Sequence, residues 1–343
     1  MSNYPEIDAL LQALCAAPGV SGCEGSAAAV AASLLAKDMP VQIDALGSVT
    51  GVAEAEGETL LLDAHIDQIG LVVTAVDAQG FLKFSRCGGA DARVLAAAQV
   101  TVHGREALPG VIISTPPHLR GGDEKKRAEI DDLAIDIGLS QAAAQQLVSP
   151  GDRVTFNGDY VHLCGSRVCA PAIDDRAGVA VILRCLQLLR GVAHPLRLAV
   201  QFSVQEETGG GGAQTATFTL RPAQAIACDV SFASAPGIDK EKYAALGGGT
   251  MIGYAPSLDY EMSRRLSALA EEKEIAAQPE VMGGRTGTNC DHIQVSRGGV
   301  RTALLSVPLR NMHTACEIAD LADLEASARL MAAYIAEGGG ADA

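Results

Sequence analysis

The stretch LLLDAHIDQIG, residues 60–70, joins an apolar run to a group of polar side chains. Leu60–Asp63 predicts a buried strand, and His65 and Asp67 follow directly after it. Ligands of open α/β sheets bind outside the carboxyl ends of the strands. We therefore expect an α/β fold whose functional site begins at His65.

Three further apolar runs end in the same way. They predict strands at Leu196–Val204, Ala225–Val230 and Thr302–Val307. The polar side chains at or beyond their carboxyl ends are Glu206, Glu207, Asp229 and His313. The first run is nearly continuous in apolar residues, as expected for a strand buried on both faces of a sheet. The acids and imidazoles are thus predicted to meet at one edge.

Each of these features has an ordinary explanation when it is taken alone. Asp174 is expected to cap the helix that follows it, an HxD pair is often a structural hydrogen bond, and adjacent glutamates are often solvated. Glu206 and Glu207, however, end a buried strand, where two carboxylates repel each other unless a cation compensates them. The shared position of these side chains therefore predicts a metal site. Asp291 and His292 only superficially resemble a ligand pair, and the other histidines, at 103, 118, 162 and 194, are interpreted as structural.

Charge and composition exclude several classes of protein. The chain has 343 residues and a net charge of −15, which argues against a nucleic-acid partner because the phosphate backbone needs a basic face. The short basic run Lys125–Arg127 is predicted to be a solvated loop. Nine cysteines are scattered without a CxxC pair, which favours reduced thiols over disulfides or a thiolate metal site.

The same sequence predicts a cytoplasmic protein with no membrane partner. No apolar run approaches the ~20 residues that span a bilayer. The N-terminal segment carries early acids and lacks the basic region of a secretory signal; it predicts a helix instead.

The predicted secondary-structure pattern changes twice along the chain. Two helices separated by the turn Pro18–Gly22 begin it, and an α/β pattern returns after residue 164. Between about 70 and 163, short β-like segments alternate with glycine and proline turns, which predicts a small β-rich module. The predicted strands of the module are Gly70–Ala75, Phe81–Phe84, Gln99–His103, Gly110–Ser114 and Asp152–Phe156, with a polar loop at 118–130 and a helix at Gln141–Leu147. Later helices are predicted at Leu258–Glu274 and 321–336.

Several motifs, in order along nearly the whole chain, resemble the M42 family of metallopeptidases. They are PGVSG (18–22), AHIDQIG (64–70), IDIG (135–138), AIDDRAG (172–178), SVQEETGGGGA (203–213), CDVSFA (228–233) and the stretch from Thr286 to Glu317. The family contains glutamyl, leucyl and deblocking aminopeptidases, and some members are called endoglucanases. The resemblance implies an aminopeptidase that removes the N-terminal residue of short peptides.

The resemblance also implies an architecture. A mixed-sheet, zinc-peptidase-like catalytic α/β domain would comprise residues 1–69 and 164–343. The β-rich segment 70–163 would be an inserted dimerisation domain. Dimers would assemble into a homo-oligomer, a dodecamer, that admits only short peptides.

The family pattern implies a role for each residue of the site. Two divalent ions, zinc or cobalt with manganese as a further candidate, would be bound by His65, Asp174, Glu207, Asp229 and His313. Asp174 would bridge the ions, and Asp67 would orient the His65 ring. A water that bridges the metals would attack the peptide, with Glu206 as the general base.

The chain departs from the family pattern at positions that are not expected ligands. Gln68 replaces a more usual glutamate, Thr288–Cys290 replaces a TDA stretch, and four glycines follow at Gly209–Gly212. These differences leave the preferred N-terminal residue open. One hypothesis places Arg285, Arg301 or Arg310 near the substrate, where an arginine would favour an acidic side chain.

Two alternatives to an aminopeptidase remain at this point. A glycoside hydrolase needs two carboxylates and no metal, which would leave His65, His313 and Asp229 unexplained. The chain also has no tryptophan and only 3% aromatic residues for stacking on sugars. A catalytically silent oligomeric scaffold is the second alternative, and the complete set of expected ligands argues against it.

Overall fold

A computed structural model describes residues 3–116, 129–237 and 243–339. His118, the basic run Lys125–Arg127 and most of the polar loop predicted at 118–130 lie outside this part. Within it, no helix combines the length and the apolar character that crossing a bilayer requires. The cytoplasmic location stays a prediction.

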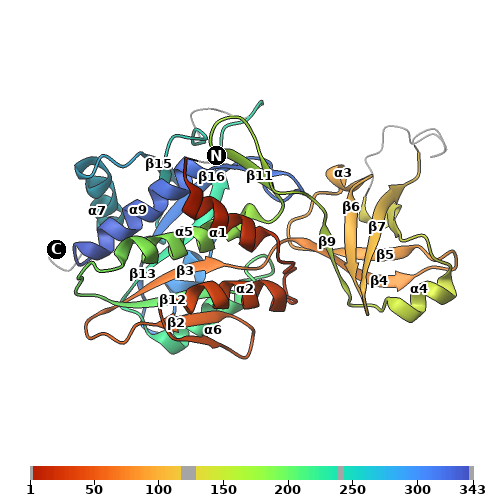
Figure 1. The fold of residues 1–343 in the computed structure, drawn as a ribbon, viewed down its shortest axis with the longest axis horizontal. Helices are drawn as coiled ribbons and strands as arrows, with labels where there is room; N and C mark the ends of the chain where they lie inside the picture. The colour runs from red at the N-terminus through yellow and green to blue at the C-terminus, as the bar shows by residue number, and fades with distance from the viewer. Residues whose placement is uncertain (1–2, 117–128, 238–242, 340–343) are drawn as a thin grey trace.

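Eight strands of the described chain form one mixed sheet in the order β1-β2-β12-β3-β13-β16-β14-β15. Their bounds are β1 Val41–Ile43, β2 Val49–Val52, β3 Thr59–His65, β12 Arg197–Ser203, β13 Gln224–Phe232, β14 Thr250–Tyr254, β15 Ala277–Val281 and β16 Arg301–Leu309. The neighbours β12, β3, β13 and β16 run parallel. Their carboxyl ends therefore meet at one edge of the sheet (Figure 1).

Helices cover both faces of this sheet because its side chains alternate between two cores. Leu60, Leu62 and Ala64 of β3 belong to the larger core, whereas Leu61 belongs to a smaller one. The larger core includes residues of α1 Pro5–Cys15, α2 Gly25–Leu35, α5 Ile173–Leu189, α7 Tyr260–Glu272 and α9 Leu321–Ala336. The smaller core includes residues of α6 Gly211–Leu220 and α8 Cys290–Ile293. Burial on both faces explains the nearly continuous apolar sequence of the central strands.

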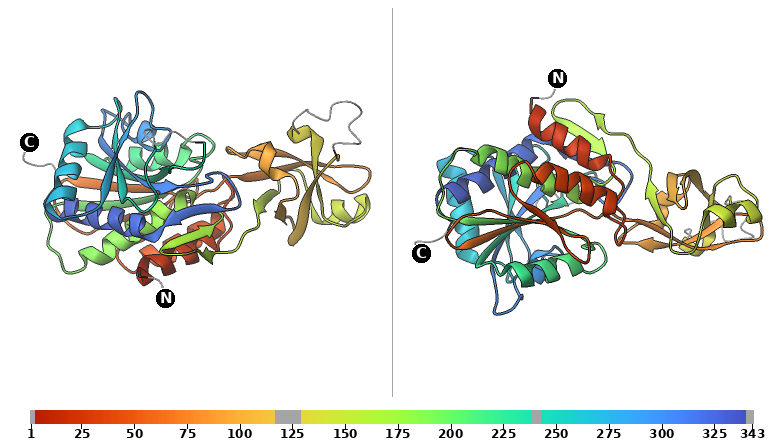
Figure 2. Two further views of the ribbon diagram at one scale, coloured as in Figure 1. Left: turned by 90° about the horizontal axis from the view of Figure 1, so that it is seen from above. Right: turned by 60° about the horizontal axis from the view of Figure 1, so that its bottom comes forward.

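A closed barrel lies beside the sheet (Figures 1 and 2). It is formed by β4 Gly70–Val76, β5 Leu82–Cys87, β8 Leu133–Asp136, β7 Ala107–Ser114, β6 Gln99–His103 and β9 Arg153–Phe156, in that order around the barrel, with the short helices α3 Ala92–Leu95 and α4 Gln141–Leu147 attached. Its side chains form a hydrophobic cluster of their own. Closure leaves these strands without a free edge. The exact boundaries 69/70 and 163/164, and the dimerising role of this segment, stay predictions.

A small antiparallel sheet joins the chain after the barrel to the last helix. It contains β10 Val161–His162, β11 Arg167–Ala170 and β17 Glu317–Asp320. Its register pairs Ala170 with Glu317. This pairing brings Glu317 close to the beginning of α5, which follows β11 directly.

Candidate active site

The carboxyl edge of the central strands brings the predicted site residues together. Nε2 of His65, at the end of β3, lies 3.9 Å from Oδ1 of Asp229 on β13 and 4.0 Å from Oε2 of Glu206 beyond β12. Nε2 of His313 lies 3.3 Å from Oε1 of Glu207. Parallel register explains part of this convergence, since Ser203 pairs with His65 and the glutamates follow Ser203.

The Asp174 carboxylate lies between the two imidazoles. Its Oδ1 is 3.1 Å from Nε2 of His65, and its Oδ2 is 3.2 Å from Nε2 of His313. One carboxylate thus presents one oxygen to each ring. This is the arrangement in which a single acid can serve two neighbouring cation sites.

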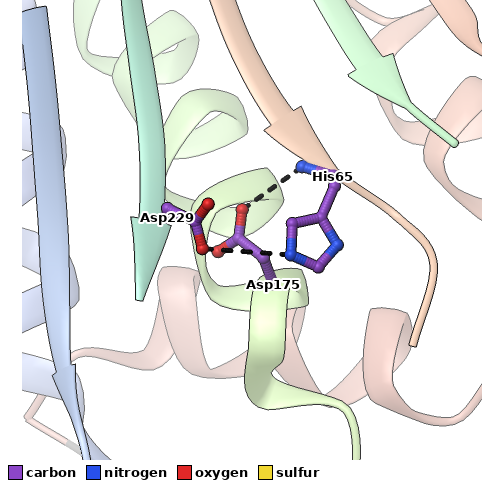
Figure 3. Close-up of side chains that lie close together, drawn as sticks. All are labelled: His65, Asp175 and Asp229. Carbon is purple, nitrogen blue, oxygen red and sulfur yellow. Dashed lines mark hydrogen bonds and ion pairs between the residues drawn. The ribbon is translucent and has the colours of Figure 1, made fainter. Parts of the chain in front are cut away.

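Two groups of side chains within the described residues have the proximity that a metal ion requires. His65, Asp175 and Asp229 form one group (Figure 3), and Asp174, Glu207 and His313 form the other. In each group the potential ligand atoms lie within 4.8 Å of one another. Every donor is an imidazole nitrogen or a carboxylate oxygen, a set that suits zinc, cobalt or manganese.

Asp175 is a neighbour that the sequence analysis did not single out. Its Oδ2 accepts a hydrogen bond from the backbone N–H of His65 at 3.3 Å, and its Oδ1 accepts one from the N–H of Gly178 at 2.8 Å. The expectation that Asp174 caps α5 was therefore wrong. Asp175 accepts the bond from the third residue after it, because the Asp174 side chain turns instead toward the two imidazoles. In the sequence, the two adjacent acids of AIDDRAG (172–178) could have indicated a role for Asp175.

Asp67 connects His65 to both glutamates. Its Oδ1 accepts a hydrogen bond from the N–H of Glu206 at 3.0 Å, and its Oδ2 accepts one from the N–H of Glu207 at 3.2 Å. Nδ1 of His65 lies 3.1 Å from the Asp67 carbonyl oxygen and 3.4 Å from Oδ1. The side chain is fully buried. Its carboxylate therefore fixes the turn after β12 as well as contacting the His65 ring.

Burial and mutual charge shift the pKa values across the site. Burial raises the pKa of Glu206 to about 7. Pairing with the carboxylates of Asp174 and then Glu207 raises the pKa of His313 to about 11. Burial alone would raise the pKa of Asp174, but its bonds to His313 and His65 bring it below the ordinary value. The acids of this cluster are stabilised when positive charge lies between them.

Divalent cations fit this donor set. Glu207 Oε1 is buried and makes no hydrogen bond, although His313 lies beside it. All ion-pair partners of His65 and His313 within the described chain are carboxylates. The buried acids of the site outnumber its two imidazoles, so negative charge remains uncompensated, which is costly unless cations neutralise it.

Glu317 is a second buried acid that the sequence analysis did not identify. Its Oε2 accepts a hydrogen bond from the N–H of Asp174 at 3.0 Å, and its Oε1 accepts one from the N–H of His313 at 2.8 Å. Burial, then the charge of Asp174, raises its pKa to about 8. A single carboxylate thus holds the backbones of two site residues. Its position four residues after His313 in the quoted motif was the only signal.

A turn of the barrel segment lies against the site. A Cβ at Gly88 would contact Glu207, and a Cβ at Gly89 would lie only 2.4 Å from Nδ1 of His313. Any side chain at residue 89 would therefore displace the imidazole. The barrel segment contributes to the shape of the site even though the polar groups come from other parts of the chain.

The histidines interpreted as structural have other partners. His103 bonds to Thr155, His162 bonds to Asp8 and His194 bonds to a backbone carbonyl. His292 lies 3.0 Å from the amide of Gln214, and its ring packs on Gly210. None of these four joins either metal-competent group of the described residues.

An α/β sheet with imidazoles and carboxylates at its carboxyl edge has the donor set of a metal-dependent enzyme. The profile of the family described as M42 glutamyl aminopeptidase matches residues 47–330. The chain belongs to this M42 aminopeptidase family. The family resemblance inferred from the motifs is thereby confirmed, and so is the mixed α/β fold class.

Individual relatives agree with this assignment. The lysyl aminopeptidase of Pyrococcus furiosus is 31% identical over 96% of each chain. A TET aminopeptidase from the marine-sediment archaeon Thaumarchaeota archaeon SCGC AB-539-E09 has a similar structure, with a TM-score of 0.93, 29% identity and coverage of 99% of this chain and 98% of that one. The TET1 peptidase of Pyrococcus horikoshii, which can assemble into a tetrahedron or a large octahedral shell, has a TM-score of 0.83 at 30% identity over 96% of this chain and 99% of its own.

These relatives decide between the functions considered from the sequence. The chain is an enzyme, an aminopeptidase of the M42 type, and the silent-scaffold alternative is not supported. The glycoside hydrolase alternative is not supported either, because the matching family and the relatives named above are aminopeptidases or peptidases and because both imidazoles belong to the polar cluster.

Proposed function

We propose that the chain removes the N-terminal residue of short peptides with the help of two divalent metal ions. One ion would be held by His65, Asp174 and Asp229, and the other by Asp174, Glu207 and His313. The placement of the Asp174 oxygens between the two imidazoles carries this proposal. Zinc or cobalt suits the donor set, with manganese as a further candidate.

Metal ions in such a site polarise the scissile carbonyl and lower the pKa of a nearby water. The protein's own contribution to proton transfer would come from Glu206. Its carboxylate accepts no hydrogen bond from the residues that the structure describes, so it is free to accept a proton from water. The same carboxylate would then give that proton to the departing amine nitrogen.

Asp67 and Glu317 would act by positioning. Asp67 holds the N–H groups of Glu206 and Glu207, and Glu317 holds those of Asp174 and His313. Buried acceptors of this kind fix the orientation of ligand side chains and raise metal affinity.

At the level of assembly, we propose a homo-oligomer in which the barrel segment, about 70–163, mediates dimer contacts. The catalytic part would then comprise residues 1–69 and 164–343. The related TET1 peptidase, which is found as a dodecamer and can form a tetrahedron, supports a dodecamer as the assembled state.

A panel of aminoacyl-p-nitroanilides tests the proposed chemistry. The protein is stripped of metal, and zinc, cobalt or manganese is added back, with N-acetylated substrates as controls. We expect release only from substrates with a free amine and only after metal is restored. Equal release from acetylated substrates, or full activity in the presence of a chelator, would contradict the proposal.

A further inference from the structure

A cavity of about 350 Å³ adjoins the candidate active site. His313 and Ala315 form part of its wall on the side of the sheet. Val94, Leu95, Ala98 and Phe156 of the barrel segment face them. The imidazole of a proposed metal ligand is therefore also part of the cavity wall, so a group in the cavity would lie beside the reacting centre.

The cavity offers little to a charged ligand. Its lining includes no Asp, Glu, Lys or Arg. Two of its polar residues are already engaged within their own loop, since the Thr314 hydroxyl donates to the Asn311 carbonyl at 2.8 Å and the Asn311 amide donates to the Cys316 carbonyl at 3.3 Å. The His313 ring is paired with Asp174 and Glu207. What remains is the Cys316 thiol and a mainly aliphatic surface that includes the ring of Phe156.

Two of the arginines considered for substrate binding have other partners. Arg301 pairs with Asp259 at 2.9 Å, and Arg310 donates to the Ser234 carbonyl at 2.8 Å. A separate cavity, whose walls include Tyr254 and Met282, contains none of the proposed site residues. The cavity at His313 is therefore the better candidate for contact with the substrate.

We infer that this cavity binds an apolar side chain of the peptide, from one of the two residues that flank the scissile bond. The inference rests on the proposed function and gives it a substrate class: peptides with leucine-, methionine- or phenylalanine-like side chains there. The volume lies at the lower end of the range for small-ligand pockets and has room for one large side chain. Removing one methylene from a side chain that fills such a pocket changes kcat/KM by about 10- to 200-fold.

Two substrate series separate the two positions. In one series of aminoacyl-p-nitroanilides the first residue is Ala, Leu, Phe, Glu or Lys. In a second series of dipeptides the first residue is Ala and the second is varied in the same way. We expect Leu and Phe to exceed Glu and Lys in kcat/KM by at least tenfold in one series. A preference in the first series would show that the cavity binds the side chain of the first residue, and a preference in the second series would show that it binds that of the second.

Filling the cavity should remove this preference. Ala98→Phe places a ring among the lining residues, whereas Ala96→Phe, at an exposed neighbour outside the lining, is the matched control. We expect Ala98→Phe to lower kcat/KM for Leu and Phe substrates at least tenfold and to change Ala substrates less than about twofold. The control should leave both unchanged.

A charge at the rim provides a second variant in case the buried ring disturbs folding. Val94 and Val111 are both exposed on the barrel segment, but only Val94 lines the cavity. Val94→Lys should raise kcat/KM for Glu relative to Leu at least fivefold, and Val111→Lys should not. Equal preference for apolar and charged side chains in both series would overturn the inference, as would filling and control variants that behave alike.

A binding measurement keeps this test independent of turnover. L-leucine, L-glutamate and glycine are titrated by calorimetry into the unmodified protein, Ala98→Phe and Ala96→Phe. We expect leucine to bind at least tenfold more tightly than glutamate, with this difference lost in Ala98→Phe and kept in Ala96→Phe. Absence of hydrolysis for every free-amine substrate would contradict the proposed function, whereas equal binding of leucine and glutamate would contradict the cavity inference alone.

Discussion

Glu206 and Glu207 are adjacent in sequence but have different surroundings, which assigns them different roles. Glu207 contacts His313 and is part of a metal-competent group, whereas Glu206 is not. Glu206→Gln keeps the size of the side chain but cannot accept a proton. We expect it to retain both metals and to lose turnover by about 10²- to 10⁴-fold, the contribution of a general base.

Glu207→Gln is the matched control for that substitution. It should lose one metal, and activity should recover partly when metal is added in excess. Metal content by mass spectrometry, measured beside kcat, separates the two results. Loss of metal from Glu206→Gln with normal content in Glu207→Gln would exchange the two roles.

Most of the residues with direct chemistry were predictable because they stand at or beyond strand ends, whereas the bridging role of Asp174 followed from the family motif. All five expected ligands and Glu206 lie together in the structure, although their roles stay proposals. Asp175 and Glu317 were not found, because they act on backbone N–H groups that only the fold brings near them. Hydrogen bonds to the backbone of a distant segment leave no spacing pattern in the sequence.

At the scale of elements, a buried polar pair joins β3 to α8. Asn289, just before α8, donates to Asp63 at 2.8 Å and to the hydroxyl of Ser203 at 2.7 Å. Asn289→Asp would place two buried carboxylates together and remove the amide that donates to Asp63. We expect a loss of about 3–5 kcal/mol in stability, as for other uncompensated buried charges.

Exchanging the two residues should restore the pair. In Asp63→Asn with Asn289→Asp, the amide donates from the opposite side and the Ser203 hydroxyl can donate to the new carboxylate. Thermal unfolding at one fixed protein concentration compares the single and double variants. A double variant no more stable than Asn289→Asp would show that the pair does not determine the contact between β3 and α8.

The first turn of α9 contains a buried acid that makes stability depend on pH. Asp323 accepts hydrogen bonds from the N–H groups of Gly247 and Gly249 at 2.8 and 2.7 Å, and burial raises its pKa to about 7. The unfolded chain has a pKa near 4 for aspartate, so the folded chain binds this proton more tightly. The stability from this group is full below about pH 4 and is lost as the pH rises to about 7.

Asp323→Asn removes this titration. The variant should be less stable at pH 5, because one N–H group loses its acceptor, but its melting temperature should fall less between pH 5 and pH 8. Asp159→Asn, at an exposed position, is the control and should follow the unmodified protein. Parallel pH profiles for all three proteins would assign the pH dependence to other groups.

Where apolar periodicity was strong, the helix and strand boundaries predicted from the sequence agree closely with those in the structure. The helix at 321–336 and the strand Gln99–His103 have the predicted bounds. Strand β8 and the short helix α3 were not identified as elements, because four residues are too few to establish a period. Strand order was also not predicted, since it depends on pairing between distant segments and not on local pattern.

At the scale of the whole molecule, the barrel segment links assembly to the shape of the site. Its Gly88–Gly89 turn lies against Glu207 and His313, and its α3 lines the apolar cavity. Contacts that order the barrel in an oligomer would therefore also order one wall of the site. The sequence identified this segment as β-rich but could not place it beside His313, because that contact joins residues far apart in the chain.

This link predicts that assembly and substrate size are coupled. If the chain forms a closed shell with its sites inside, short peptides should be hydrolysed while folded proteins with free N-termini are excluded by size. Sedimentation velocity gives the mass of the assembled protein. The same sample is then assayed on substrates of increasing size, from dipeptides to a folded protein, so that assembly and substrate size are measured together. A single large species that turns over only the short members agrees with the shell. A monomer that degrades short peptides and accessible protein N-termini equally well would contradict both the assembly and the role given to the barrel, since an open site next to solvent has no means of excluding a long chain.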